Sequence, residues 1–217
     1  GGRCAVEAVD AGIRAMLDTA GRLPLPPYIG RDEEAADRTR YQTIYARVDG
    51  SVAAPTAGLH FSPAVIEQLR ARGIDFLTVT LHVGPGTFVP IRSTPDQHRM
   101  EAEWCRVPGE TAEVINRVHR EGGRVVAVGT TTVRTLESAA DERGRICARE
   151  GSTSLFIRPG YRFRIVDGLV TNFHLPRTTL LCLVMALAGC EPVRAAYRAA
   201  IAERYRFYSY GDAMLIL

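Results

Sequence analysis

The sequence has no lysine, a single tryptophan, no CxxC pair and no long hydrophobic run. Its five cysteines are scattered and odd in number, which argues against a zinc knuckle and favours reduced thiols in the cytoplasm. The longest apolar run, residues 180–188, is far shorter than the roughly 20 residues that span a bilayer. The first residues show neither the basic nor the apolar region of an export signal. We therefore expect a cytoplasmic protein without a membrane partner.

Because lysine is missing, all 27 basic residues are arginines, and the formal net charge is +3. Arginine binds phosphate through a planar fork of donors, so this composition suits an RNA partner. A coding bias toward arginine produces the same composition without any such partner. No motif of a known DNA-binding type is present, so we expect no DNA partner and expect any RNA to be held by arginines.

Residues 50–61, GSVAAPTAGLHF, have neither a helical nor a strand period, so a packed element does not explain them. Glycines and a proline surround Thr56 and His60, an arrangement that lets a ligand approach the backbone closely. Residues 82–88 and 171–176 repeat the combination of histidine, small residues and a rigid turn. Three such loops predict one shared pocket, although each alone is also typical of an ordinary connection with a solvated histidine.

The rest of the pattern alternates strands with helices, which predicts an α/β architecture with a partly parallel sheet. We expect helices over 5–20, 38–46, 63–72, 110–121, 130–140, 178–188 and 192–205. We expect strands over 74–83, 100–107 and 124–128, a hairpin of 154–157 with 163–166, and a final strand within 207–217. Residues 141–152 are expected to form a polar loop. Ligands in such folds bind at the carboxyl ends of strands, where His82 and Gly129 are expected.

Gly129 separates the expected strand 124–128 from a helix that begins with Thr130, Thr131 and Thr132. A strand, a glycine and a hydroxyl-rich helix start offer free backbone N–H groups to an anion or a polar ligand. The stretch lacks the full glycine fingerprint of nucleotide-binding folds, so a plain helix cap explains it equally well.

Eight long and unusual segments follow one another along the chain. They are LPLPPYI (23–29), YQTIYA (41–46), GSVAAPTAGLHF (50–61), TLHVGPGTF (80–88), AVGTTTVRTLESAA (127–140), LFIRPGYRF (155–163), TNFHLPRTTLL (171–181) and YRFYSYGDAMLI (205–216). Together they resemble the S-adenosylmethionine:tRNA ribosyltransferase-isomerase family of queuosine biosynthesis. The resemblance runs from about Gly21 to the last residue. Two positions depart from it: Glu101 and Ser152 stand where the family usually has a histidine and a tryptophan.

The resemblance implies a larger, barrel-like α/β domain with a mixed sheet and a smaller β-barrel domain near the N-terminus. The chain begins at Gly1 without a methionine, so we expect that an N-terminal part precedes it and that most of the smaller domain is absent. Residues 1–22 are then a helix and the remnant of a link, and residues 23–217 form the larger catalytic domain. A chain reduced in this way is expected to act poorly compared with a complete family member.

The resemblance also implies the reaction. The ribosyl group of S-adenosylmethionine is transferred to 7-aminomethyl-7-deazaguanine in tRNA and isomerised, giving epoxyqueuosine, adenine and methionine. S-adenosylmethionine is thus a substrate, and no cofactor or metal is expected. Histidine and carboxylate suit the proton transfers near neutral pH, so the candidate catalytic residues are His60, His82, His174 and Asp212. The candidate substrate-binding residues are Thr56, Gly58, Gly84, Gly86, Thr87, Phe88, Gly129, Thr130, Thr131, Arg134, Glu137, Asn172 and Tyr210.

Arg134 and Glu137 lie three residues apart on the helix after Gly129, a spacing that predicts an ion pair at the edge of the pocket. Two other functions remain open. One is a truncated, non-catalytic remnant of the family that only binds tRNA. The other is a metal-dependent hydrolase with the loop histidines and Asp212 as ligands, although no two of them have the short spacing of zinc ligands.

Overall fold

The computed structural model describes residues 12–84, 91, 94 and 97–217, and it divides the chain into two compact units. One unit ends at Arg40, and the other comprises Tyr41–Leu217. The boundary expected from the sequence, after residue 22, lies inside the first unit; as a division between functional domains it stays a prediction.

Within its described residues, 12–40, the first unit contains three short helical segments, and polar contacts hold the chain around them. They are α1 (Ile13–Ala20), the 3₁₀ segment η1 (Pro27–Ile29) and α2 (Asp37–Arg40). The Arg31 guanidinium donates to both carboxylate oxygens of the buried Asp37, at 2.6 and 2.9 Å. The helix expected over 38–46 is wrong, because α2 ends at Arg40 and the following residues form turns. The helix expected over 5–20 is present from Ile13, and its first half lies outside the described residues.

The first sheet of the second unit has the order β1-β2-β4 and is antiparallel throughout. Its strands are β1 (Thr80–His82), β2 (Glu103–Val107) and β4 (Arg149–Thr153). Along β2 the buried positions alternate with more exposed ones, so one face of the strand points into the core. His82 is the last residue of β1, at the strand end where the sequence placed it.

The second sheet has the order β3-β5-β6 and is mixed, as expected from the sequence. β3 (Val126–Val128) pairs in parallel with β5 (Gly168–Asn172), and β5 pairs antiparallel with β6 (Ala213–Ile216). The described strands thus form two open sheets and no closed barrel. The α/β class is confirmed, whereas the barrel-like arrangement is not seen in this part of the chain.

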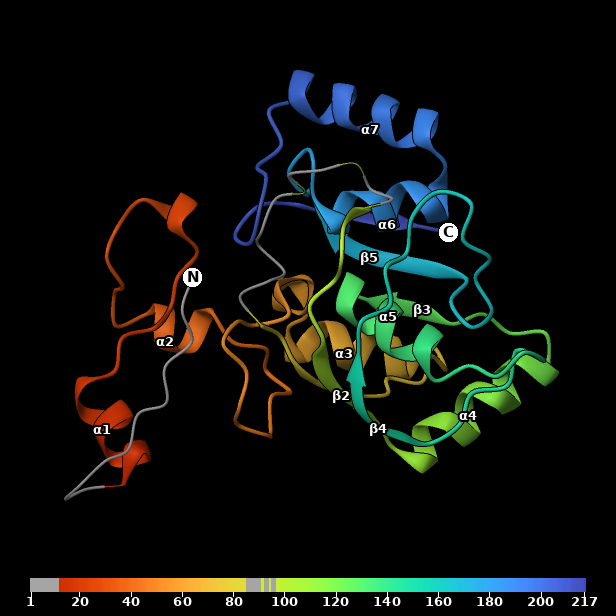
Figure 1. The fold of residues 1–217 in the computed structure, drawn as a ribbon, viewed down its shortest axis with the longest axis horizontal. Coiled ribbons are helices and arrows are strands. Elements are labelled where there is room, and N and C mark those ends of the chain that lie inside the picture. The colour runs from red at the N-terminus through yellow and green to blue at the C-terminus, as the bar shows by residue number, and fades with distance from the viewer. Residues whose placement is uncertain (1–11, 85–90, 92–93, 95–96) are drawn as a thin grey trace. The chain divides into compact units, whose positions relative to one another are not determined.

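In the described part of this unit, five helices and a 3₁₀ segment lie around these sheets (Figure 1). They are η2 (Thr56–His60), α3 (Pro63–Ala71), α4 (Gly109–Arg120), α5 (Thr130–Ser138), α6 (Thr179–Ala188) and α7 (Cys190–Ala202). The core gathers side chains of β2, β3, β5, α4, α5 and α6, among them Val107, Ile115, Val133, Leu169 and Leu183. Among the described residues no single helix is long and apolar enough to cross a membrane; α6 and α7 meet that criterion only together, across a bend of 113°.

Four further expectations about local structure are wrong. Residues 141–152 are not one loop, because β4 begins at Arg149 and pairs with β2. Residues 154–157 and 163–166 form no hairpin; they run as irregular chain past the end of α5. Residues 171–176 are not all loop, since Thr171 and Asn172 end the central strand β5. Residues 50–61 likewise contain the 3₁₀ segment η2.

Candidate active site

Asn172 joins two of the segments that the sequence singled out. It is the last residue of β5, and only 2% of its surface is exposed. Its side-chain oxygen accepts a hydrogen bond from the Thr56 hydroxyl at 3.1 Å, and its Nδ2 lies 3.1 Å from Nε2 of His60. Thr56 and His60 are the first and last residues of η2. The buried amide therefore fixes this 3₁₀ segment against the carboxyl end of the strand.

The same amide determines which nitrogen of His60 carries the proton. Because Nδ2 can only donate, Nε2 of His60 accepts, and the neutral imidazole holds its proton on Nδ1. Partial burial lowers the pKa of His60 below its ordinary value, and the negative charge of Asp212 opposes this shift. In its neutral form His60 thus carries its N–H at Nδ1, and its acceptor Nε2 is bound to Asn172.

The turn at Gly129 lies beside this cluster. Gly129 follows β3 with φ +91°, and its N–H donates to the carbonyl oxygen of Val170 in β5 at 2.9 Å. A Cβ built on Gly129 would lie 3.7 Å from Cβ of Ala57 in η2. Thr130 and Thr131, both buried, form the first turn of α5. The start of α5 therefore meets η2 at the carboxyl ends of two adjacent parallel strands, as the sequence predicted for Gly129.

Asp212 stands just before β6, next to the position that pairs with Asn172. Its carboxylate accepts the backbone N–H of Arg206 at 2.7 Å and lies 3.4 Å from the Arg206 guanidinium. These hydrogen bonds lower the pKa of Asp212. The carboxylate thus holds a loop in place and contributes negative charge near His60; no hydrogen bond between the two residues is described.

The beginning of residues 50–61 contacts β1 and not β5. The Ser51 hydroxyl accepts the N–H of Val83 at 2.9 Å and donates to the carbonyl of Ala53 at 2.7 Å. Gly50, with φ +130°, lies against the ring of His82, where a Cβ would be 2.6 Å from Cε1. The His82 ring also packs on Trp104, with centroids 4.6 Å apart. One twelve-residue stretch therefore links the end of β1 to the end of β5.

His174 occupies different surroundings. Its Nε2 lies 2.6 Å from the Thr171 hydroxyl. The Tyr197 hydroxyl accepts the backbone N–H of His174 at 2.8 Å and donates to the backbone carbonyl of His174 at 3.1 Å. Burial lowers the pKa of His174 to about 4 and raises that of Tyr197 to about 12. Thr171 and Asn172 are neighbours in a strand, so their side chains point to opposite faces. In the described part of the chain, no hydrogen bond joins the imidazoles of His60, His82 and His174, and their convergence stays a prediction.

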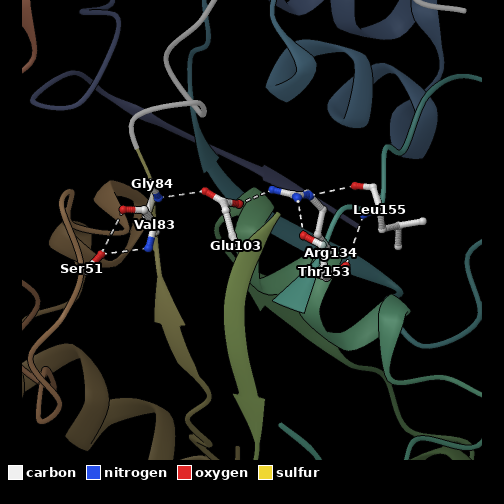
Figure 2. A network of polar contacts seen from close by, with 7 residues as sticks. All are labelled: Ser51, Val83, Gly84, Glu103, Arg134, Thr153 and Leu155. Atoms are coloured by element: carbon white, nitrogen blue, oxygen red, sulfur yellow. Dashed lines mark hydrogen bonds and ion pairs between the residues drawn. The ribbon is translucent and has the colours of Figure 1, made fainter. Parts of the chain in front are cut away.

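Arg134 does not pair with Glu137. It forms a buried ion pair with Glu103 of β2, and it donates to the carbonyl oxygens of Leu155 at 2.9 Å and Thr153 at 3.3 Å. The second carboxylate oxygen of Glu103 accepts the N–H of Gly84 at 3.2 Å. Figure 2 shows this network running from the end of β1 through Glu103 to α5 and β4. The predicted ion pair is wrong, because each of its members faces a partner distant in sequence.

Glu137 is instead the anchor of the irregular segment after β4. Its carboxylate accepts the backbone N–H groups of Arg164, Ile165 and Val166 at 3.0–3.2 Å and the hydroxyl of Tyr161 at 3.2 Å. These donors satisfy the buried carboxylate and fix residues 161–166 against α5. Arg134 and Glu137 are thus bound to other parts of the protein, and their contact with substrate stays a prediction.

The remaining candidates are placed as follows. Gly58 is buried against Thr43 and Tyr45, and Tyr210 is 37% exposed with its ring edge-on to Tyr41. Gly86, Thr87 and Phe88 lie outside the described residues. The described residues contain no group of three or more histidine, cysteine, aspartate or glutamate side chains that could hold a metal ion.

Comparison with known proteins identifies the family. The sequence pattern described as queuosine biosynthesis protein matches residues 2–216. The chain belongs to this family.

Curated relatives of the family carry the name S-adenosylmethionine:tRNA ribosyltransferase-isomerase. The protein of Syntrophotalea carbinolica is 57% identical over 203 residues, that of Sorangium cellulosum 58% over 207, and that of Sphingopyxis alaskensis 56% over 213. These matches cover 93%, 94% and 97% of this chain, but only 59%, 55% and 61% of the relatives. The chain thus spans little more than half the length of the family members that it matches.

A solved structure supports the fold. The crystal structure of S-adenosylmethionine tRNA ribosyltransferase from Thermotoga maritima matches with a TM-score of 0.62 and 48% sequence identity. The match covers 75% of this chain and 51% of that one.

Sequence reasoning missed Glu103, although a signal for it exists. Glu103, Cys105 and Val107 alternate along β2 and are all buried. The period of two in the expected strand 100–107 places a carboxylate on the core face, where it needs a partner. The identity of that partner is not encoded locally, because Arg134 lies 31 residues further along the chain.

Proposed function

We propose that this chain carries part of the catalytic site of an S-adenosylmethionine:tRNA ribosyltransferase-isomerase, which builds epoxyqueuosine on 7-aminomethyl-7-deazaguanine in tRNA and releases adenine and methionine. The observation that carries the proposal is the position of Asn172. In a chain of this family, a buried amide holds His60 and Thr56 at the carboxyl end of β5, beside the first turn of α5. Binding sites of open α/β sheets lie at such strand ends.

The chemistry requires a base for the proton beside the sulfonium, a neutral substrate amine and a donor that assists the departure of adenine. His60 is suited to the donor function, since its Nδ1 carries the proton while Nε2 is held by Asn172. To accept a proton at Nε2, the ring must first leave Asn172. Once protonated, it is stabilised by the negative charge of Asp212. His174 lacks that help, because its burial opposes protonation.

S-adenosylmethionine is bound as a substrate, and we propose that no cofactor or metal takes part. tRNA with the 7-aminomethyl-7-deazaguanine precursor is the second substrate, and the cytoplasm is the expected compartment. The 2% exposed Asn172 and the first turn of α5 supply the polar groups of the site from the part of the chain described here. We further propose that the barrel-like arrangement of the larger domain requires the part of the family sequence that this chain does not span.

The test is adenine release from S-adenosylmethionine in the presence of precursor-containing tRNA. A chain extended to the full length of the relatives should release adenine, and the present chain should be slower. In the extended chain, Asn172→Ala should lower the rate more than Asn116→Ala. Asn116→Ala is the matched control, because it removes an amide of α4 that binds the backbone of Ile146 and does not belong to the candidate site. Binding of tRNA without adenine release would indicate a non-catalytic remnant. Release that depends on an added metal ion would favour a metal-dependent enzyme.

A further inference from the structure

The loop between α7 and β6 alternates arginine with aromatic residues. Residues 204–210 read Arg-Tyr-Arg-Phe-Tyr-Ser-Tyr, and this segment, here named the 204–210 loop, joins the two elements at the blue end of the ribbon (Figure 1). Arg204 is exposed, and the Arg206 side chain exposes 77% of its surface. Tyr205 and Tyr210 are 49% and 37% exposed. Cationic and aromatic groups thus share one short surface segment.

The 204–210 loop is held in a defined shape. Two hydrogen bonds between Arg206 and Asp212 close the loop. The backbone N–H of Arg206 donates to the Asp212 carboxylate, and the backbone N–H of Asp212 donates to the Arg206 carbonyl, both at 2.7 Å. Gly211 completes the turn, where any Cβ would collide with the Arg206 carbonyl oxygen. Phe207 packs on Phe173 and Tyr197 beneath the surface. A preformed loop loses little conformational entropy when it binds a ligand.

Two residues of the loop adopt a backbone conformation that side chains disfavour. Arg204 has φ +57° and Tyr208 has φ +72°. Among the described non-glycine residues only Arg177, which follows the carboxyl end of β5, shares this feature. Backbone strain of this kind is costly and gathers at functional segments. Its repetition in a seven-residue loop fits a surface shaped for binding.

The 204–210 loop lies next to the candidate active site. The Tyr208 N–H donates to the carbonyl of Phe173, the residue after Asn172, at 3.1 Å. Asp212, which closes the loop, is also the carboxylate whose negative charge raises the pKa of His60. A ligand that rests on this loop therefore reaches the carboxyl end of β5.

We propose that the 204–210 loop binds the unpaired nucleotides beside the base that the enzyme modifies, as a single-stranded RNA surface. This inference rests on the proposed function and deepens it by assigning a site to the tRNA. Exposed tyrosines stack on the faces of unpaired bases, and arginines contact the phosphates between them. Bases inside a duplex are already stacked, so the aromatic contribution selects a loop over a helix.

Arginine alone does not account for this pattern. A surface that binds polyanions in general needs charge and has no use for exposed tyrosines, which expose apolar area to water at a cost. The charges here are also few, because Arg206 pairs with Asp212 and Glu203 lies beside Arg204. The contact that distinguishes the proposed partner is therefore stacking on Tyr205, supported by the two arginines.

The experiment measures binding of this chain to a synthetic RNA hairpin with an anticodon-type loop, and to the same sequence annealed as a full duplex. Tyr205→Leu should weaken hairpin binding by about fivefold or more, whereas Tyr205→Phe, which keeps the ring, should restore it. Duplex binding should be weak and unaffected by either variant. Circular dichroism checks that each variant is folded, because Tyr205 also packs on Phe173.

Charge is tested separately from the tyrosine. The double variant Arg204→Gln/Arg206→Gln should weaken hairpin binding and reduce the slope of log affinity against log salt by about 2. The matched control is Arg143→Gln/Arg145→Gln, which removes the same charge. These two residues follow the C-terminal end of α5, whereas Gly129 precedes its N-terminal end, and the Arg145 side chain is 72% exposed. The control should change binding less than twofold.

Three outcomes overturn the proposal: no measurable hairpin binding, equal loss in the two arginine pairs, or full binding by Tyr205→Leu. Hairpin binding is measured without S-adenosylmethionine, so these outcomes do not depend on catalysis. If the extended chain releases no adenine while the hairpin results are as expected, the proposed function fails and the RNA surface stands.

Discussion

Glu103 of β2 and Arg134 of α5 form an ion pair in which each side chain exposes only 5% of its surface. The pair also closes a chain of hydrogen bonds, because Glu103 accepts from Gly84 while Arg134 donates to Thr153 and Leu155. Most of the lone pairs and N–H groups that burial would leave unsatisfied thus have partners. A buried pair of this kind ties β2, β4 and α5 to the chain that follows β1.

Removal of one member should be costly, because the other charge is left buried. Glu103→Ala is expected to lower the free energy of unfolding by about 3–5 kcal/mol in urea denaturation. The control is Glu150→Ala. Glu150 lies on β4 and forms an exposed ion pair with Arg106 of β2, so its removal should cost about 1 kcal/mol or less. Equal losses in the two variants would show that burial does not govern the Glu103–Arg134 pair.

The hydrogen bond from Asn172 should fix the tautomer of His60. Nitrogen-15 NMR at neutral pH is expected to show the His60 proton on Nδ1. Asn172→Ala should shift the population toward the Nε2–H form, and Thr56→Val should do so partially, since it removes the hydroxyl that orients the amide. The His119 signals serve as an internal reference. An Nε2–H ring in the unmodified protein would contradict the described geometry.

Asp212 should raise the pKa of His60 through its charge. Asp212→Asn is therefore expected to lower the pKa of His60 in an NMR titration, because the protonated ring loses a nearby negative charge. Asp141→Asn, a carboxylate in the segment after α5, provides the comparison and should leave the His60 titration unchanged. A rise in the His60 pKa on replacing Asp212 would mean that the two groups do not interact as described.

Burial of His174 should make the stability depend on pH. The pKa of about 4 in the folded protein lies below the ordinary value of 6.5, so the unfolded chain takes up a proton first as the pH falls. Stability is therefore complete above pH 6.5 and is lost between pH 6.5 and 4, by about 3 kcal/mol in total.

The comparison is urea unfolding at several pH values for the protein and for His174→Gln, which keeps a polar group near the Thr171 hydroxyl. The variant should lose stability less steeply over this range. Parallel curves for the two proteins would show that His174 does not titrate abnormally.

Gly58 should tolerate no side chain. A Cβ at this position would collide with the Tyr45 hydroxyl and lie 2.7 Å from Cγ2 of Thr43. Gly58→Ala is expected to cost about 1–3 kcal/mol of unfolding free energy, and Tyr45→Phe in the same chain should recover part of it. Gly84→Ala, where a Cβ meets no atom of the described residues within 4 Å, is the matched control. A neutral Gly58→Ala would show that η2 can move away from Tyr45.

Local signals in the sequence are sufficient for several elements. Ser62 and Pro63 predict the start of α3, and the Ser62 hydroxyl does accept the N–H of Val65. The apolar run 125–128 followed by Gly129 predicts a parallel strand and a helix start, and β3 and α5 are found there. Caps, prolines and glycines act within a few residues, so these boundaries do not depend on the rest of the fold.

The sequence by itself also determined the family, because its long segments keep their order and identity along the chain. Only the tertiary structure decided which polar groups meet. The sequence named Arg134, Glu137 and Asn172 as candidates but not their partners. Arg134 binds Glu103, Glu137 binds the backbone of residues 164–166, and Asn172 binds Thr56 and His60. Strands β4 and β5 were likewise missed. A strand and a buried ion pair are stabilised by groups far away in the chain, and no local pattern specifies which distant group folding will bring into contact.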